Sequence, residues 1–169
     1  MPVRPILQLG NPQLYETSAP VTHSELADMR TVVTDLHDTM IEFRRAYGAG
    51  RAIAAPQIGV MKRLVYMHID HRSTVFINPV LDNRSEEMIE IWDDCMCFPD
   101  LLVKVRRHKS CRIRYRNLEW KEEDMAIADD LSELLQHECD HLDGILAVSR
   151  AIDPRSFALR SERAYLSPR

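Results

Sequence analysis

Residues 136–144 of this sequence read Gln-His-Glu-Cys-Asp-His-Leu-Asp-Gly. If this segment is helical, His137 and His141 project from the same face about one turn apart, and both imidazoles can converge on one metal ion. Glu138 can then reach a water molecule on that ion, where a general base has to be. The spacing predicts a catalytic metal centre of the H-E-x-x-H type.

A helix is predicted around this motif, beginning at about Asp129 or Asp130. Apolar residues recur in it every three or four positions, at Leu131, Leu134, Leu135, Cys139 and Leu142. Asp130 and Glu133 have the spacing of a capping box, and Gly144 follows the expected end. The two histidines therefore lie on the best-defined amphipathic helix of the chain.

A catalytic site of this kind needs a third protein ligand. The extended motif H-E-x-x-H-x-x-G-x-x-H matches as far as Gly144, but Ala147 occupies the third histidine position. Glu162 is the only glutamate after His141, and it lies in a short tail with little pattern. Cys95 and Cys97 offer thiolates that suit a borderline-soft metal ion, and spacing alone does not choose between them.

The remaining sequence predicts an α+β fold. Apolar residues with helical spacing predict one long N-terminal helix from Leu26 to Tyr47, started by a capping box at Thr22 and Glu25. Strands are predicted between the two helices, at 63–69, 74–81, 88–92, 101–105 and 110–116, and Pro79 suggests that its strand is at an edge or ends there. A last short helix is expected after Asp153-Pro154. We expect one domain over residues 1–169, with antiparallel β-sheets packed around the helix that carries the H-E-x-x-H motif.

The composition narrows the classes of protein. The chain has 169 residues, 45% of them hydrophobic, and a formal net charge of -4. No apolar run approaches the ~18 residues needed to cross a bilayer, and no secretion signal is expected. The slight negative charge argues against a DNA-binding protein. The four cysteines are expected to be free thiols, as in a cytoplasmic protein.

Three segments, in this order, resemble the signature motifs of the peptide deformylases. The third motif, Q-H-E-x-D-H-L-x-G, is matched at every fixed position by residues 136–144. The first, G-x-G-[hydrophobic]-A-A-x-Q, is similar to Gly50 through Gln57, with Ala52 in place of the second glycine. The second, E-G-C-x-S, falls on residues 93–97, where Cys95 is kept.

The resemblance implies a fold of β-sheets around the motif helix and a divalent metal ion, Fe²⁺ or Zn²⁺, for which Ni²⁺ or Co²⁺ could substitute. It implies that the ligands are Cys95, His137 and His141. It also implies hydrolysis of the N-formyl group of formyl-methionyl peptides, with release of formate, in the cytoplasm or in an organelle that makes such chains. The implied catalytic groups are the Glu138 carboxylate, the Gln57 amide and the Met96 backbone N–H, and the implied substrate-binding residues are Gly50, Arg51, Ala52 and Ile53.

The departures from these motifs concern the substrate. Asp93 is one methylene shorter than the glutamate of the second motif, Asp94 adds a charge where glycine is expected, and Cys97 replaces serine. Asp129 and Asp130 replace small or apolar residues that border the methionine pocket in the family, although helix capping explains them equally well. An extra carboxylate near the metal is expected to repel acidic substrates.

Two alternatives stay open on these residues. One is a deformylase-like amidase for another N-acyl substrate, suggested by the acidic replacements. The other is a non-catalytic, ribosome-associated paralogue that uses a basic stretch for transient contact with RNA; this stretch consists of Lys104, Arg106, Arg107, Lys109, Arg112, Arg114 and Arg116. A half-buried strand with a solvated charged face explains the same residues.

Overall fold

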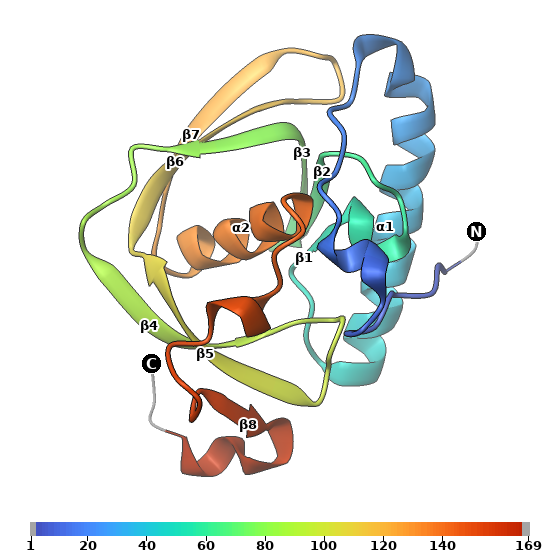
Figure 1. Cartoon of the computed structure of the whole chain (residues 1–169). Helices are drawn as coiled ribbons and strands as arrows, with labels where there is room; N and C mark the ends of the chain where they lie inside the picture. Colours follow the sequence, from blue (N-terminus) through green and yellow to red (C-terminus); the bar gives the residue numbers. More distant parts are fainter. Residues whose placement is uncertain (1–2, 167–169) are drawn as a thin grey trace.

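The computed structural model describes residues 3–166, and they form two antiparallel sheets and two α-helices (Figure 1). One sheet has five strands in the order β1-β2-β3-β6-β7, and the other has three in the order β4-β5-β8. The strands of the larger sheet are β1 (Ala52–Ala54), β2 (Leu64–Ile69), β3 (Arg72–Asp82), β6 (Ser110–Arg116) and β7 (Glu122–Ala128). Those of the smaller sheet are β4 (Met88–Asp94), β5 (Leu101–His108) and β8 (Phe157–Leu159). The helices are α1 (Leu26–Tyr47), α2 (Asp129–Leu142) and the 3-10 helices η1 (Pro12–Tyr15), η2 (His23–Glu25), η3 (Ala55–Ile58), η4 (Ala147–Arg150) and η5 (Arg160–Tyr165).

Helix α2 lies in the middle of the fold, with strands of both sheets around it (Figure 1). Its apolar residues Leu134, Leu135 and Leu142 share one buried cluster with Ala54 and Phe76 of the larger sheet. Burying these side chains is the main term that holds the helix in place, because a helix of this length is marginal by itself. The expected α+β fold, with antiparallel sheets around the motif helix, is confirmed.

Helix α1 has the bounds that its apolar spacing predicts. The expected capping box at Thr22 and Glu25 is present, and Gly48 ends the helix in a left-handed conformation with φ of 67°. Met40 and other apolar side chains of its inner face pack against residues of β1 and β2 in a second buried cluster. No helix in residues 3–166 is long and apolar enough to cross a membrane.

Five strands match predicted segments, and three of them, β3, β4 and β5, are longer than predicted, whereas β1, β7 and β8 were not predicted. The first residues of β7, Glu122, Glu123 and Asp124, are exposed. Their outward carboxylates interact with neighbouring side chains, as in the ion pairs of Arg112 with Asp124 and of Arg116 with Glu122. Cross-strand charge pairs of this kind can stabilise an edge strand that has no alternation of apolar and polar residues. The first half of β7 therefore lacks the alternating pattern by which strands are predicted.

Pro79 neither ends β3 nor lies on a strand that is at an edge over its whole length, but it lies past Ile77, where the pairing with β2 stops. β3 pairs with β2 on one side and with β6 on the other. Its register with β6 shifts between Ile77 and Val80, so Pro79 lies in an irregularity where the ladder does not need its missing N–H.

The chain after Asp153-Pro154 forms a turn and a strand before any helix. The Ser156 hydroxyl donates a hydrogen bond to the Asp153 carboxylate, and the Ser156 N–H donates to the Asp153 carbonyl. β8 then pairs with β5, with Leu159 opposite Leu101. The helix expected at Pro154 is therefore displaced to η5, and the C-terminal segment extends the smaller sheet.

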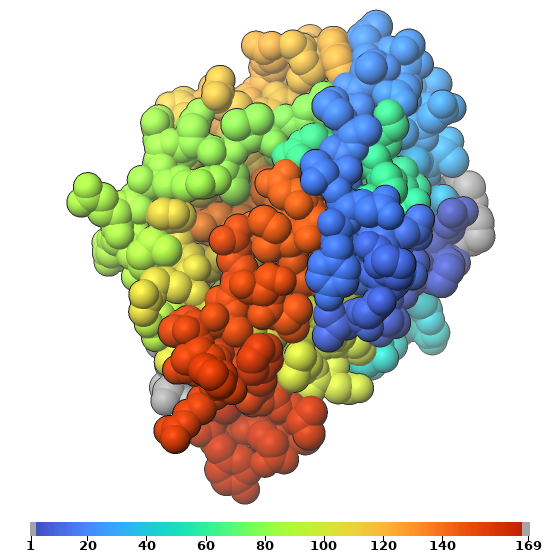
Figure 2. Space-filling model, viewed as in Figure 1, coloured from blue at the N-terminus to red at the C-terminus, as the bar shows by residue number. Residues whose placement is uncertain are grey.

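Gly144 lets the chain after α2 pack directly on the N-terminal arm, which lies beside it in the space-filling view (Figure 2). Its φ is 71°, and a Cβ atom there would lie 2.5 Å from the Tyr15 backbone oxygen. The Ser18 N–H, close by in the same arm, donates a hydrogen bond to the Leu142 carbonyl.

Replacing Gly144 with Ala should lower the free energy of unfolding by about 2–4 kcal/mol, because backbone strain and a backbone clash add. Gly59→Ala is the matched control, since Gly59 also has a positive φ, of 79°, but no atom within 4 Å of the added Cβ. It should lose only about 1 kcal/mol. Urea unfolding of both variants measures the difference; equal losses would mean that the arm yields to the added methyl group.

Candidate metal centre

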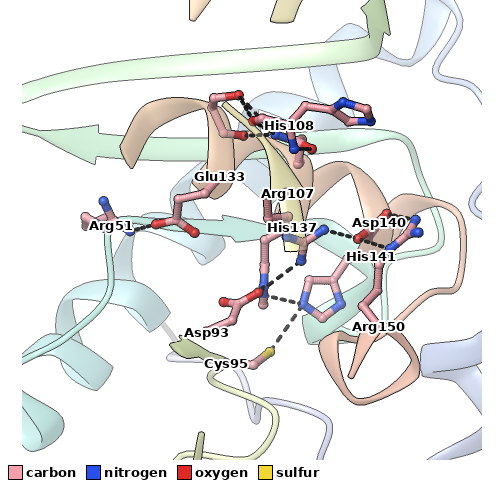
Figure 3. A network of polar contacts seen from close by, with 12 residues as sticks. Arg51, Asp93, Cys95, Arg107, His108, Glu133, His137, Asp140, His141 and Arg150 are labelled. Atoms are coloured by element: carbon pink, nitrogen blue, oxygen red, sulfur yellow. Dashed lines mark hydrogen bonds and ion pairs between the residues drawn. The ribbon is translucent and has the colours of Figure 1, made fainter. Parts of the chain in front are cut away.

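The two histidines of α2 face a common point with Cys95, which follows the end of β4. The Nε2 atoms of His137 and His141 are 3.2 Å apart, and the Cys95 Sγ is 3.3 Å from the His141 Nε2 (Figure 3). The ligand atoms of all three residues lie within 4.8 Å of one another, and all three residues are buried. The two imidazoles therefore converge as the helical spacing predicts. The fold brings the Cys95 thiol to the same point from the segment after β4.

These donors fit a tetrahedral metal ion. With metal–nitrogen bonds of about 2.0–2.1 Å and metal–sulfur bonds of about 2.3 Å, tetrahedral ligand atoms lie roughly 3.3–3.6 Å apart. The observed separations are close to this range. Among residues 3–166, Cys95 joins the two histidines in a group whose ligand atoms are close enough to hold one metal ion. Cys97 and Glu162 do not belong to this group. The structure thus brings together the three residues that the family resemblance implied.

Asp93 orients His137 from the side away from this point. The His137 Nδ1 is 3.0 Å from the Asp93 carboxylate and donates to it, which leaves the Nε2 free to face Cys95 and His141. Burial lowers the pKa of His137, but the charge and hydrogen bond of Asp93 raise it to about 10. The same electron donation strengthens this imidazole as a ligand for a cation.

Arg107 holds Asp93 in its charged form. The Arg107 guanidinium is 3% exposed, lies 3.0 Å from the Asp93 carboxylate and also donates to Asp140, which Arg150 contacts at 2.6 Å (Figure 3). Burial opposes ionisation, yet His137 and Arg107 lower the pKa of Asp93 to about 2. The solvated face that explains the basic stretch does not extend to Arg107, because this side chain completes a buried network of alternating charges behind His137.

Replacing Asp93 with Asn should weaken metal binding by about 10- to 100-fold, because His137 loses its anionic partner. Asp94→Asn is the matched control, since the Asp94 carboxylate instead contacts Arg160 at 2.8 Å. Competition against a chelator measures the affinity of both variants. If the two variants bind metal equally well, Asp93 does not act through His137.

Glu138 lies between the two histidines in the sequence of α2. Its side chain lines a cleft that His137 also lines. Burial raises the pKa of Glu138 to about 7. Its Oε2 atom is buried and has no hydrogen-bond partner among residues 3–166. A carboxylate in this state can take up and release a proton near neutral pH.

Gln57 and Met96 also line the cleft. The Gln57 Oε1 accepts a hydrogen bond from the Ala54 N–H at 2.7 Å, so its amide nitrogen points toward Cys95 and Cys97 at 3.7 and 3.6 Å. This amide is fixed in orientation before any ligand binds, which is the condition for stabilising a developing negative charge.

The cleft has a volume of about 520 Å³ and is walled by segments far apart in the sequence. Gly50, Arg51 and Ala52 line it, whereas the Ile53 side chain is fully buried in the cluster beneath α1. The carboxylates of Asp129 and Asp130, which were weighed as a border of the substrate pocket, do not line the cleft. The carboxylate that α2 contributes to the cleft wall from this end is Glu133. Sequence reasoning missed Glu133 and, from η5, Arg160 and Arg163. The position of Glu133, four residues before His137, was a usable signal that it shares the ligand face of the helix.

A central helix with His137 and Glu138 on the wall of a polar cleft, and His141 directly beside His137, defines a metallohydrolase of the H-E-x-x-H class. A family model for polypeptide deformylase matches residues 3–156. The chain therefore belongs to the peptide deformylase family.

Individual relatives agree with this assignment over nearly the whole chain. The peptide deformylase of Leptospira biflexa is 33% identical, covering 96% of this chain and 95% of its own length. The crystal structure of the Thermotoga maritima peptide deformylase has a TM-score of 0.83 at 25% identity and covers 90% of this chain and 100% of that one. A class I type b peptide deformylase from Acinetobacter baumannii, solved with Met-Ala-Ser bound, has a TM-score of 0.81 at 28% identity. The match covers 88% of this chain and 98% of that one.

Proposed function

We propose that this chain is a metal-dependent peptide deformylase, which removes the formyl group from the N-terminal formyl-methionine of newly made polypeptides. The observation that carries the proposal is the buried group Cys95, His137 and His141 beside Glu138 in the cleft of a family member. In the overall reaction water adds to the formyl carbon, the C–N bond breaks, and formate and a free amino group are released. Neither alternative from the sequence is favoured by the relatives.

The cofactor that we propose is one Fe²⁺ or Zn²⁺ ion held by Cys95, His137 and His141, with Ni²⁺ or Co²⁺ as substitutes. Such a cation supplies Lewis acidity, which lowers the pKa of water and polarises a carbonyl. Burial raises the pKa of the Cys95 thiol, so its thiolate is stable only next to a cation. Burial also lowers the pKa of His141, which keeps that imidazole neutral and able to bind metal.

The catalytic roles that we propose are supported by the positions of Glu138 and Gln57 in the cleft. Glu138 takes the proton of the attacking water and then donates a proton to the leaving nitrogen, as its raised pKa allows. The Gln57 amide and the Met96 backbone N–H stabilise the oxyanion that forms on the formyl carbon. Gly50, Arg51 and Ala52, which line the cleft, bind the substrate backbone, and the small residues Gly50 and Ala52 leave room for it.

The partners that we propose are N-formylmethionyl peptides. The Acinetobacter baumannii relative was solved with Met-Ala-Ser bound, which is the product expected from a formylated tripeptide. Transient ribosome contact through the basic stretch 104–116 has less support, because all seven of its cations form ion pairs with carboxylates of this chain. We further propose one domain over residues 1–169, working in the cytoplasm or an organelle where formylated chains are made.

The test is formate release from formyl-Met-Ala-Ser by protein loaded anaerobically with Fe²⁺ or Ni²⁺. Acetyl-Met-Ala-Ser is the matched control, since it differs by one methyl group at the reacting carbonyl. Formate release without turnover of the acetyl peptide supports the proposal. A folded, metal-loaded protein that releases no formate would contradict it.

A further inference from the structure

Arg51 and Glu133 form an ion pair on the wall of the cleft. The Arg51 Nη2 lies 2.6 Å from the Glu133 Oε1, and both residues line the cleft (Figure 3). The Glu133 side chain is only 4% exposed, while the Arg51 side chain is 40% exposed. The carboxylate is therefore the buried anchor of the pair, and the guanidinium is the part that a ligand in the cleft meets.

This ion pair lies next to the metal centre. Glu133 precedes His137 by four residues on α2, so the two side chains project from one face about one turn apart. Arg51 directly precedes strand β1, and its side chain donates a hydrogen bond to Glu133 from there. In an N-formyl amino acid, the Cβ atom of the first residue is within about 4 Å of the formyl carbon. With the formyl group beside the ligands, the first side chain of the substrate extends toward this wall.

An apolar side chain gains little against such a wall. It would cover the outward N–H groups of Arg51 without replacing their hydrogen bonds to water, and burying polar groups without partners is costly. A guanidinium has five N–H donors, and Arg51 uses one of them on Glu133. An acceptor at the end of the substrate side chain can take the others. Because Glu133 already holds the guanidinium, little conformational entropy is lost on binding.

Two of the other carboxylates that line the cleft are held by partners of their own. Asp93 is engaged by His137 and Arg107, and Asp94 by Arg160. Arg163, also on the cleft wall, adds a further positive charge. The cleft also has apolar lining at Trp92 and Leu134 and carboxylates at Asp70 and Glu138, so it is the part of the wall formed by Arg51 that offers hydrogen-bond donors to the substrate.

We propose that the Arg51–Glu133 pair is a specificity element, which selects N-formyl substrates whose first side chain ends in a hydrogen-bond acceptor over apolar side chains of similar length. This inference rests on the proposed deformylase function. A carboxamide or a sulfoxide is a strong acceptor, and the methionine thioether is a weak one. The expected order of preference is glutamine and methionine sulfoxide first, then methionine, then norleucine.

The experiment compares four formyl-Xaa-Ala-Ser peptides, in which Xaa is glutamine, methionine sulfoxide, methionine or norleucine. For the metal-loaded wild type, kcat/KM for the glutamine peptide should exceed that for the norleucine peptide by about tenfold or more. In the double variant Arg51→Leu with Glu133→Leu this ratio should fall below one. Both residues are replaced together because either charge alone would be left without its partner.

The matched control is the pair of Glu42 and Arg45 on α1, whose charged atoms are also 2.6 Å apart but which lies outside the cleft. Its double leucine variant should keep the wild-type ratio. If the wild type prefers norleucine, the specificity inference is wrong although formate release stands. Formate from none of the four peptides would instead contradict the proposed function. Should the Arg51 and Glu133 double variant fail to fold, Arg51→Lys keeps the ion pair, and loss of the preference there supports a role for the guanidinium fork.

Discussion

Replacing Glu138 with Gln should reduce formate release by about 100- to 10,000-fold while the metal content stays unchanged, because a buried general base is lost and no ligand is. The side chains are nearly isosteric, so packing around the buried position is conserved. Gln cannot accept the proton of water or deliver one to the leaving nitrogen. Formate assays and metal analysis of the same preparation separate the two effects.

Glu162→Gln is the control for this substitution, since Glu162 lies in η5, outside the group of ligand atoms around His137. It should retain wild-type activity and wild-type metal content. Equal activity in wild type and Glu138→Gln would overturn the mechanism. Loss of metal from Glu138→Gln would mean that the carboxylate belongs to the metal site itself.

Replacing Cys95 with Ser should remove most of the bound metal, with a loss of affinity larger than the about 100-fold that losing an outer partner can cost. A hydroxyl is a poor ligand in the place of a thiolate, and the remaining imidazoles supply only two of three donors. Activity should be lost together with the metal. Metal analysis after dialysis against a weak chelator measures the effect.

Cys97→Ser is the matched control, because the same atom is replaced two residues away. The Cys97 Sγ lies 3.6 Å from the Gln57 amide, and Cys97 is not part of the ligand group. This variant should keep its metal. Loss of metal from Cys97→Ser, with retention in Cys95→Ser, would show that the two thiols have been assigned the wrong way round.

The two helices were predictable from the sequence because their signals are local. A capping box, an apolar stripe and a terminal glycine all lie within the segment that forms α1, and its bounds Leu26–Tyr47 were predicted. The short strands were not predictable in the same way. β1 is a buried three-residue run, and β7 is stabilised by ion pairs with strand β6, so neither has the alternation of a half-buried strand.

The residues of the candidate site also fall into those that local sequence predicts and those that only the fold brings together. His137, Glu138 and His141 are related by helical spacing, so their common face follows from the sequence. The groups behind His137 do not follow from it, because its partner Asp93 comes from the end of β4 and Arg107, which donates to Asp93, comes from β5. In the sequence Arg107 was one cation of a basic stretch. Only the structure shows that it is buried between two carboxylates, one of which contacts His137.

By itself, the sequence determined the α+β class, the family and the helix that presents two imidazoles and a carboxylate, because these depend on contacts within a few residues. The tertiary structure decided which thiol meets the imidazoles and that Arg51 contacts Glu133 on the wall of the cleft. These contacts join residues more than 40 positions apart, as in Cys95 with His141 and Arg51 with Glu133. Their geometry is set by how the sheets pack around α2, and no local pattern records that packing.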